Sequence, residues 1–338
     1  MRPARGIEPR TLVVAPSWIG DAVLSHPLLV RLKERDPAGR IDVLAPAWVL
    51  PVYRRMPEVS DAIAQPFGHG DLKLGERRAF ARSLRAYDDA IVLPNSWKSA
   101  LIPWHAGIKR RTGYIGEIRY GLLNDVRALD KAALPLIVER YAALAQPARE
   151  PLRRPLPAPR LVVDEASRRA TLRTQGLEAD RPITVMAPGA EYGPAKRWPA
   201  RHFAELAKML AARGDRIWLL GSKKDAPITA EIQELSGAIC VDLAGRTSLD
   251  EAIDLMSLAS RVVTNDSGLM HVAAALDRPM AALFGSSSPQ FTPPLSAHAR
   301  VITLKLSCSP CFERVCPLGH TNCLVTLEPG RVLQEMSH

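Results

Sequence analysis

The sequence predicts an α/β protein built from two doubly wound parallel sheets. Short β-branched runs alternate with helical patterns along nearly the whole chain, which is typical of βαβ units. The pattern is interrupted near the middle by a proline- and arginine-rich segment. The length of 338 residues also exceeds what one hydrophobic core usually supports, since single cores stop growing near roughly 250 to 300 residues. We therefore expect two domains.

The predicted elements of the first half are three strands and one amphipathic helix. The strands are short runs of β-branched and other apolar residues at 11–15, 41–45 and 89–93. The helix covers 21–34. Its apolar residues recur at helical spacing, and they are Val23, Leu24, Leu28, Leu29 and Leu32.

A connector separates the two halves. Residues 146–160 read QPAREPLRRPLPAPR, and so many prolines cannot continue a helix or a sheet, so the segment is a semi-rigid spacer. We place the domain boundary at its end, which gives an N-terminal domain of residues 1–160 and a C-terminal domain of residues 161–338. The last helix of the chain is free to pack back on the N-terminal domain.

The alternation of strands and helices restarts after the connector. Strands are predicted at 183–187, 216–220, 261–264 and 280–284, and helices at 199–212, 225–235, 248–258 and after Gly268. A capping box, Ser248-x-x-Glu251, marks the start of the third of these helices. Doubly wound sheets bind ligands at the carboxyl ends of their strands, so the strand-to-helix turns are the first candidates for a site, where the two domains face each other.

Composition narrows the class of partner. The formal charge of +10, supplied mainly by arginine, favours acidic partners such as nucleotide diphosphates, phosphorylated lipids or an anionic membrane face. No long basic stripe interleaved with aromatic residues appears, which argues against nucleic acid. No apolar stretch reaches the roughly 18 to 20 residues of a spanning helix, and residues 1–10 lack the apolar core of a secretory signal. We expect a cytosolic protein.

The first candidate turn reads PSWIGD, residues 16–21, and directly follows the first strand. Gly20 allows close approach of the backbone, and Asp21 places a carboxylate at the helix N-terminus, facing the crevice. The alternative is that Asp21 is only an N-cap, a role that aspartate fills often. Spacing alone favours the cap.

The second candidate turn reads TNDSGLMH, residues 264–271. Ser267 and Gly268 can present backbone N–H groups to a diphosphate at the helix N-terminus. Asp266 could accept hydrogen bonds from a sugar or ribose hydroxyl. His271 either donates to phosphate or packs in the core, and the sequence does not separate the two.

Two more turns in the second half carry glycine and charge. The loop 188–199 contains Gly189 and ends in KRWP, where Lys196 is placed to sit over a leaving diphosphate, with Arg197 as the competing cation. The turn 221–225 ends in Asp225, which could bind ribose hydroxyls or cap its helix. Three turns converging at one sheet edge indicate a nucleotide site.

Four cysteines form the pattern C-x2-C-x4-C-x6-C near the C-terminus, at Cys308, Cys311, Cys316 and Cys323. The first pair has a spacing common in zinc and iron–sulfur sites, but the remainder matches no standard pattern. A reduced cluster that packs a loop without metal is the simpler interpretation. If a metal binds, its role is structural, because four thiolates leave no open position.

These motifs resemble those of the lipopolysaccharide heptosyltransferases of glycosyltransferase family 9, most closely the heptosyltransferase II group. The resemblance covers nearly the whole chain. The matching stretches occur in the same order, and they are PSWIGD (16–21), LAPAW (44–48), RMPEV (55–59), FGHG (67–70), LPNSWKSALIP (93–103), the segment from RRTGY to RYGLLND (110–125), KRWP (196–199) and NDSGLMHVAAAL (265–276).

The resemblance implies the GT-B fold, two Rossmann-like domains facing a central cleft, with the acceptor on the first domain and ADP-heptose on the second. It implies metal-independent, inverting transfer of L-glycero-D-manno-heptose to the first heptose of the inner core, with no cofactor beyond the donor substrate. By position, Asp21 matches the catalytic carboxylate and Lys196 the catalytic, diphosphate-binding lysine. The other donor-binding residues implied are Gly189, Asp225, Asp266, Ser267, Gly268 and His271, of which Asp225 matches more loosely because its loop varies in length.

The implied acceptor is phosphorylated lipid A–Kdo–heptose, which the enzyme would meet at the cytoplasmic face of the inner membrane, in peripheral contact with the inner leaflet. Basic and polar residues that follow strand ends are candidates for its phosphates and carboxylates. These acceptor candidates are Ser17, Trp18, Gly20, Asn95, Ser96, Lys98 and Arg119. The competing interpretation is a solvated polar face.

Three alternatives remain open at this point. A second heptosyltransferase of the same family would add the first heptose to Kdo. A nucleotide-sugar 2-epimerase would share the fold but need no acceptor domain. A non-catalytic nucleotide-binding adaptor would use Asp21 only as a cap.

Overall fold

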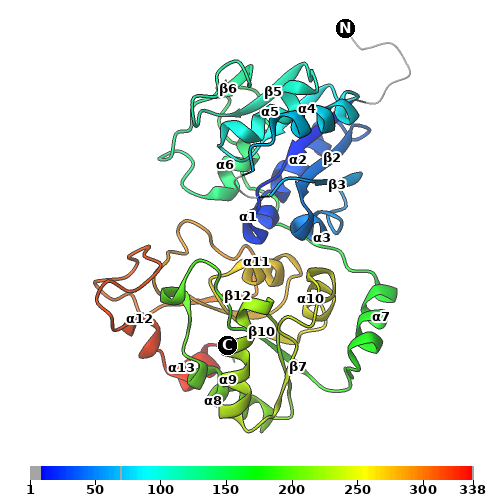
Figure 1. The fold of residues 1–338 in the computed structure, drawn as a ribbon. Helices are drawn as coiled ribbons and strands as arrows, with labels where there is room; N and C mark the ends of the chain where they lie inside the picture. Colours follow the sequence, from blue (N-terminus) through cyan, green and yellow to red (C-terminus); the bar gives the residue numbers. More distant parts are fainter. Residues whose placement is uncertain (1–8, 69–70, 337–338) are drawn as a thin grey trace. The chain divides into compact units, whose positions relative to one another are not determined.

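The computed structural model describes residues 9–68 and 71–336. His69 and Gly70 of the FGHG stretch, together with residues 1–8 and 337–338, lie outside the described residues. The chain divides between Pro159 and Arg160 into two compact units (Figure 1). Each unit is described separately below.

Unit 1 is built on one parallel sheet of six strands, in the order β3-β2-β1-β4-β5-β6. The order runs outward from β1 in both directions, so the strand order reverses between β1 and β4, which pair directly. Three of the strands were predicted within one residue at each end. The six strands are β1 (Arg10–Val14), β2 (Arg40–Pro46), β3 (Asp61–Gln65), β4 (Asp89–Val92), β5 (Arg110–Tyr114) and β6 (Asp125–Arg127).

The helices of unit 1 show one error in the sequence prediction. The single helix expected at 21–34 is two helices that meet at Ser25, because Pro27 lacks an N–H and its ring clashes with the carbonyl one turn earlier. The Ser25 hydroxyl donates to the carbonyl of Ala22 at 2.7 Å and closes the first helix. The helical elements are α1 (Ile19–Leu24), α2 (His26–Arg35), η1 (Ala47–Val49), α3 (Leu50–Tyr53), α4 (Leu74–Ala81), η2 (Arg82–Leu84), α5 (Trp97–His105) and α6 (Ile137–Ala143).

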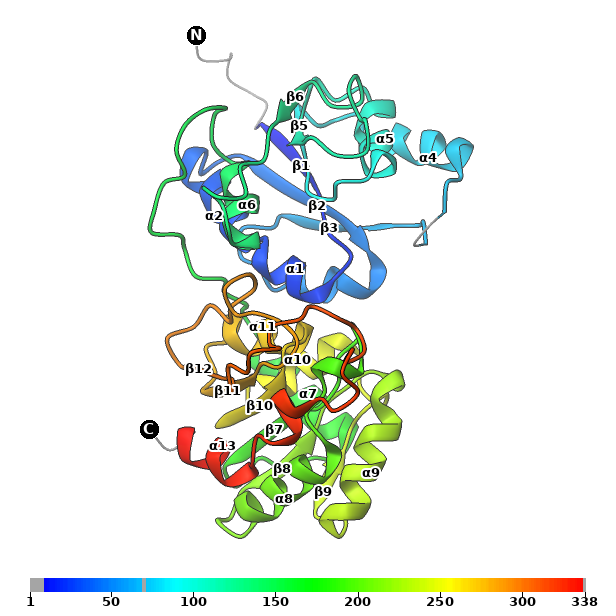
Figure 2. The same cartoon turned by 90° about the vertical axis from the view of Figure 1, so that its left-hand side faces the viewer.

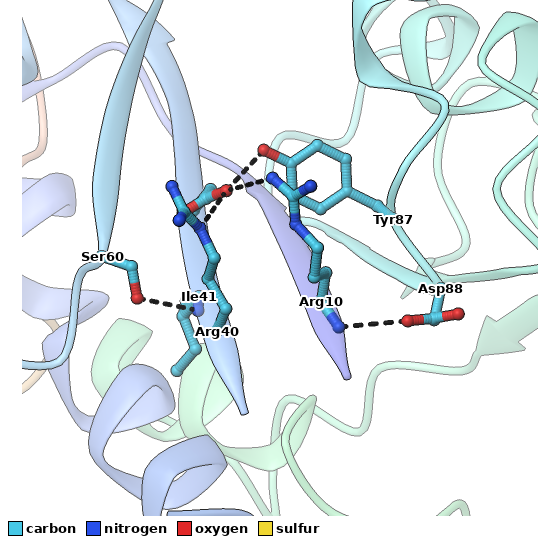
Figure 3. A network of polar contacts seen from close by, with 7 residues as sticks. Arg10, Arg40, Ile41, Ser60, Tyr87 and Asp88 are labelled. Atoms are coloured by element: carbon cyan, nitrogen blue, oxygen red, sulfur yellow. Dashed lines mark hydrogen bonds and ion pairs between the residues drawn. The ribbon is translucent and has the colours of Figure 1, made fainter. Parts of the chain in front are cut away.

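The amino ends of β1 and β2 are joined by a polar network around Asp42, which is fully buried. Arg10 and Arg40 form ion pairs with this carboxylate at 3.2 and 3.0 Å, and the Tyr87 hydroxyl donates to it at 2.6 Å. Figure 3 shows Arg10, Arg40 and Tyr87 converging from neighbouring elements. The Asp42 charge is therefore compensated by two arginines and a tyrosine, and the polar groups of this network at the amino ends of β1 and β2 already have partners within the protein.

Unit 2 repeats the architecture, with the order β12-β11-β10-β7-β8-β9 and every pairing parallel. The strand order reverses between β7 and β10. Two six-stranded parallel sheets confirm the predicted α/β class. The strands are β7 (Ile183–Ala187), β8 (Arg216–Leu219), β9 (Cys240–Asp242), β10 (Arg261–Asn265), β11 (Met280–Leu283) and β12 (Ala299–Ile302).

The helices of unit 2 pack in groups, α8 with α9 and α13, and α7 with α10 (Figure 2). The capping box at Ser248 and Glu251 is confirmed at the start of α10. The last helix, α13, contacts α8 and β12 of its own unit. The helical elements are α7 (Glu165–Gln175), η3 (Pro194–Lys196), α8 (Ala200–Ala211), η4 (Lys223–Asp225), α9 (Ala226–Ser236), α10 (Leu249–Met256), α11 (Gly268–Ala275), α12 (Asn322–Val325) and α13 (Pro329–Glu335).

The core of each unit lies between its sheet and the covering helices. Leu12, Leu44 and Val92 contribute to the core of unit 1, and Phe203, Leu219 and Leu283 to that of unit 2. Over residues 9–68 and 71–336, no helix is both long and apolar enough to cross a bilayer.

Candidate functional site

The predicted site residues follow the strands at which the strand order reverses. In unit 1, Asp21 comes after β1, and Asn95 and Ser96 come after β4. In unit 2, Lys196 comes after β7 and Asp266 after β10. Ligands of doubly wound sheets bind in the crevice that opens at this reversal, outside the carboxyl ends of the strands.

Asp21 lies in the first turn of α1 but does not cap it. The N-cap is Trp18, whose backbone is extended, and Asp21 stands three residues further on. The interpretation of Asp21 as an N-cap is therefore wrong. Its carboxylate makes no hydrogen bond or ion pair with any residue in the described part of the chain.

Burial raises the pKa of Asp21 to about 6, from an ordinary value of 3.8. Two tyrosines stand close enough to feel its charge, Tyr53 at the end of α3 and Tyr141 on α6. Burial raises the pKa of each phenol, and the Asp21 charge raises it further. The result is a half-buried carboxylate that is more basic than usual and that no cation within residues 9–68 and 71–336 neutralises.

The loop that carries Asp21 is held from one side. Trp48 of η1 donates its indole N–H to the carbonyl of Ser17 at 3.0 Å. Trp18 itself is 54% exposed, so its ring is available to a ligand of the kind expected for an acceptor sugar. Ser17, Trp18 and Gly20 thus remain candidates for acceptor contacts.

Arg119 corrects the sequence prediction. It was expected to contact acceptor phosphates, but only 1% of it is exposed, and its guanidinium is occupied within unit 1. It donates to the carbonyls of Tyr114 and Pro94 at 2.6 and 2.5 Å, and to the Asn95 side chain at 3.3 Å. Arg119 therefore ties the loop after β5 to the turn after β4 and positions Asn95, rather than meeting the acceptor.

The turn after β4 keeps polar groups at the surface. Asn95 is exposed, and Ser96 and Lys98 are half-buried. Ser96 is the N-cap of α5, and the Glu117 carboxylate accepts a hydrogen bond from the first helical N–H, that of Trp97, at 3.2 Å. These three side chains remain candidates for the acceptor.

Lys196 and Asp266 meet across the reversal point of unit 2. The Lys196 ammonium lies 2.5 Å from a carboxylate oxygen of Asp266 and 4.9 Å from the centre of the Tyr192 ring. Arg314 covers the same ring, with its guanidinium carbon 5.1 Å from the ring centre. The Lys196 ammonium is therefore fixed in place by an acid and an aromatic face.

Asn265 joins the turns after β7 and β10. It is fully buried, its amide donates to the carbonyl of Pro188 at 2.7 Å, and its carbonyl accepts from the Trp198 N–H at 3.0 Å. Because these bonds fix the two turns on either side of Lys196, the position of its ammonium relative to α11 is determined by the fold.

The N-terminus of α11 is open. Ser267 is its N-cap with an extended backbone, φ −147° and ψ 173°, and no described side chain caps the helix. The first-turn amides from Gly268 onward are therefore left for a ligand, at the positive end of the helix dipole.

His271 stands in the same helix and is neutral. Only 5% of it is exposed, and burial lowers its pKa to about 4. The Asp266 charge has a smaller effect that raises the pKa, and the Lys196 charge lowers it. Its Nδ1 has no hydrogen-bond partner among the described residues. A neutral imidazole beside the Lys196–Asp266 pair adds no charge to the site and shapes its wall.

Gly189 and Asp225 come together from neighbouring strand ends. A Cβ at Gly189 would lie 2.5 to 2.7 Å from the atoms of the Asp225 carboxylate, so any side chain at this position would force Asp225 to move. One oxygen of Asp225 accepts from the backbone N–H and the hydroxyl of Ser222, at 2.9 and 2.8 Å. The Asp225 carboxylate therefore closes the short η4 turn back on Ser222. Asp225 stands at the N-cap position of α9 but its side chain does not cap that helix, and its other oxygen accepts from no described residue.

The four clustered cysteines are free thiols in the loop around α12. Backbone N–H groups, that of Thr321 first, lower the pKa of Cys316, whereas burial and the other three thiols raise that of Cys323. Among the residues that the structure describes, no three histidine, cysteine or acidic side chains are arranged to hold a metal ion.

Sequence reasoning missed Tyr192 beside Lys196 and two buried serines at the end of β11, the strand next to β10. Tyr192, whose ring lies under the Lys196 ammonium, belongs to the loop 188–199, where only glycine and the cations indicated a site. Ser286 and Ser287 follow β11, and their buried hydroxyls have no partner among the described residues. The signal for both serines was the run GSSS directly after a predicted strand.

Comparison with known proteins gives consistent matches. The family described as glycosyltransferase family 9 (heptosyltransferase) matches residues 77–322. Lipopolysaccharide heptosyltransferase 2 of Escherichia coli (strain K12) is 50% identical over 339 residues, 97% of each chain, and the protein of that name from Salmonella typhimurium is 50% identical over 338 residues, again 97% of each. The solved structure of E. coli ADP-heptose LPS heptosyltransferase II matches at a TM-score of 0.87, with 48% identity and 97% of each chain covered.

Proposed function

The chain belongs to glycosyltransferase family 9, the heptosyltransferases, and we propose that Asp21 and Lys196 carry its chemistry. The enzyme is a glycosyltransferase of the GT-B fold and transfers heptose onto the lipopolysaccharide inner core. The donor is ADP-heptose, and the sugar moved is L-glycero-D-manno-heptose, added to the first heptose of the core.

The observation that carries this proposal is that each unit presents one of two complementary chemical functions. Unit 1 presents a half-buried, basic carboxylate with no partner in the described chain, and unit 2 presents a cation beside an uncapped helix N-terminus. A proton acceptor and a diphosphate site are the two functions that glycosyl transfer requires. We assign the acceptor to unit 1 and the donor to unit 2.

Asp21 acts as the general base. It accepts the proton of the acceptor hydroxyl while that oxygen attacks the anomeric carbon from the face opposite ADP, which inverts the configuration. A pKa near 6 keeps the carboxylate ionised at neutral pH yet more basic than an ordinary aspartate, which improves proton transfer.

Lys196 and the first-turn amides of α11 stabilise the charge that develops on the diphosphate as ADP departs. The ammonium has three donor hydrogens, so one can stay on Asp266 while the others reach phosphate oxygens. These donors are fixed before the reaction, and such preorganised contacts contribute roughly 2.7 to 4 kcal/mol each to the transition state. No divalent ion is then required.

Asp225 and Gly189 form the ribose end of the donor site. The Asp225 carboxylate oxygen that does not accept from Ser222 is available to the ribose hydroxyls. Gly189, which has no side chain, leaves room for this carboxylate. Neutral His271 shapes the wall beside the sugar.

The acceptor is phosphorylated lipid A–Kdo–heptose, met by Asn95, Ser96 and Lys98 and by the loop from Ser17 to Gly20. The enzyme works at the cytoplasmic face of the inner membrane, in peripheral contact with the inner leaflet. The net charge of +10 supports an anionic acceptor surface.

The test is transfer from ADP-heptose to an acceptor carrying one core heptose, compared with an acceptor carrying none. Preference for the first supports the proposal, and preference for the second reassigns the enzyme to the preceding step. Incubation with ADP-heptose alone distinguishes an epimerase, which would turn over the donor without an acceptor. Activity that persists in excess chelator supports the absence of a metal requirement.

A further inference from the structure

An open hollow of about 430 Å³ lies on unit 1, lined by Arg78, Arg82, Arg85, Trp104 and His105. Its residues come from α4 and η2 on one side and from the end of α5 on the other, and α4 and α5 lie side by side in Figures 1 and 2. Both segments lead into the amino ends of strands, η2 into β4 and α5 into β5. The hollow therefore lies toward the amino ends of the strands, whereas Asp21 follows the carboxyl end of β1.

The three arginines form one stripe. Positions 78, 82 and 85 are spaced four and three residues apart, so their side chains project from the same face of the α4–η2 segment. Like charges at this spacing destabilise a helix by roughly 0.2 to 0.5 kcal/mol per pair. A stripe of this kind therefore attracts anions.

No acid of the described chain supplies such an anion. Arg78, Arg82 and Arg85 make no ion pair or side-chain hydrogen bond with any described residue. Of the acids close by in sequence, Glu76 pairs with Lys73 at 3.5 Å and Asp89 with Arg110 at 2.5 Å, while Asp88 accepts a hydrogen bond from the backbone N–H of Arg10 at 3.1 Å. Elsewhere in unit 1 arginines do find acids, as Arg127 does with Asp125.

The other wall of the hollow is aromatic. Trp104 is 44% exposed, and its ring centre lies 4.8 Å from that of His105. An indole beside guanidinium groups provides an apolar face next to charged donors, the combination that proteins use where a polar headgroup meets an apolar body. Leu74, one turn before Arg78, is also exposed.

We propose that this hollow binds a phosphate group, with the three guanidiniums as donors and Trp104 as the adjoining apolar face. Guanidinium groups match phosphate oxygens in paired hydrogen bonds, and three of them around one concavity fit a phosphomonoester or phosphodiester better than a single carboxylate. Exposed Trp104 and Leu74 favour a phosphate that is carried on a lipid. A soluble phosphate is the other source of the same chemistry.

The test uses the full chain with all three arginines changed to glutamine (R78Q/R82Q/R85Q). Its matched control is R173Q/R213Q/R331Q, which removes the same charge from exposed arginines of unit 2 that lie outside the hollow. One arm measures cosedimentation with vesicles of phosphatidylcholine alone or with added phosphatidylglycerol. The other arm titrates inorganic phosphate and follows the fluorescence that is lost in a Trp104→Phe variant.

The proposal expects wild type and control to bind in at least one arm, and the triple variant to bind there roughly ten- to a hundredfold more weakly. Loss confined to the phosphatidylglycerol vesicles identifies a lipid headgroup, and loss confined to the phosphate titration identifies a soluble ligand. If the triple variant matches the control in both arms, or if wild type binds in neither, the hollow is not a phosphate site. Transfer to a soluble acceptor fragment, measured in parallel, reports that each variant is folded.

Discussion

Lys196 and Asp266 form an ion pair across the reversal point of the second sheet, Nζ to Oδ2 at 2.5 Å, although they are 70 residues apart in the chain. Both side chains are largely buried, with 16% and 6% exposed. Removing one partner of such a pair leaves an uncompensated charge, so the two residues act as a unit. The donor site is therefore built on a contact that either substitution disturbs.

Lys196→Gln should lower kcat by a factor of about 10² to 10³, because the ammonium contact strengthens as ADP departs. Asp266→Asn should cost less, and the double variant less than the sum of the two, because the residues are coupled. Steady-state kinetics of wild type, the two single variants and the double variant give the four kcat values that this comparison needs. Lys224→Gln is the matched control, since its exposed pair with Glu191 contributes little. Additive effects would show that the pair does not work as a unit.

Gly189→Ala should disturb the ribose end of the donor site. The new Cβ would lie 2.5 Å from the Asp225 carboxyl carbon, so Asp225 must move, at a cost of about 1 to 3 kcal/mol in stability. Calorimetry should show weaker ADP binding together with lower thermal stability. Gly330→Ala is the control, because a Cβ there meets nothing within 4 Å. Unchanged ADP affinity in Gly189→Ala would show that Asp225 does not contribute to nucleotide binding.

His271 should make folding stability depend on pH. Its pKa is lowered from 6.5 to about 4 by burial, so the unfolded chain binds its proton first as the pH falls. The contribution of neutral His271 to the free energy of unfolding is fully present above pH 6.5. It is lost as the pH falls toward 4, which lowers the free energy of unfolding by up to about 3 kcal/mol. Urea unfolding between pH 7 and pH 5 should therefore show a flatter profile for His271→Gln than for wild type. The exposed His298→Gln should keep the wild-type slope, and a wild-type slope in His271→Gln would mean that His271 is not buried and neutral.

The pH dependence of transfer should report Asp21. The base must be ionised, and its pKa is about 6, so kcat/KM should fall about tenfold per pH unit below pH 6 and level off above it. A wild-type profile with its half-point near pH 4 would mean an ordinary, solvated carboxylate.

Local sequence patterns predicted most of the framework. The buried strands β1, β2, β7 and β10 are short runs rich in β-branched and other apolar residues, and runs of this kind are recognisable without tertiary information. The missed strands are short or carry charge, such as β5 with its two arginines and β6, DVR. Helix α7 was also missed, because it is polar and packs through Ser167 and Thr171 on the buried Asp254.

The site could be predicted only in part. Asp21, Lys196 and Asp266 stand in turns whose residues are adjacent in sequence, so their types and spacing indicated their positions. The role of Arg119 could not be predicted, because its burial depends on carbonyls of Tyr114 and Pro94 that the fold brings to it. The same is true of the neighbourhood of Asp21, since Tyr53 and Tyr141 reach it from other helices.

The most direct test is the rate of heptose transfer by Asp21→Asn at saturating ADP-heptose, with the donor dissociation constant measured on the same protein. Because the base is lost while the donor site is untouched, we expect transfer to fall by a factor of about 10² to 10⁴ with the dissociation constant nearly unchanged. The variant should be no less stable than wild type, since burial disfavours the ionised carboxylate. Transfer at the wild-type rate would contradict the assignment of Asp21 as the base.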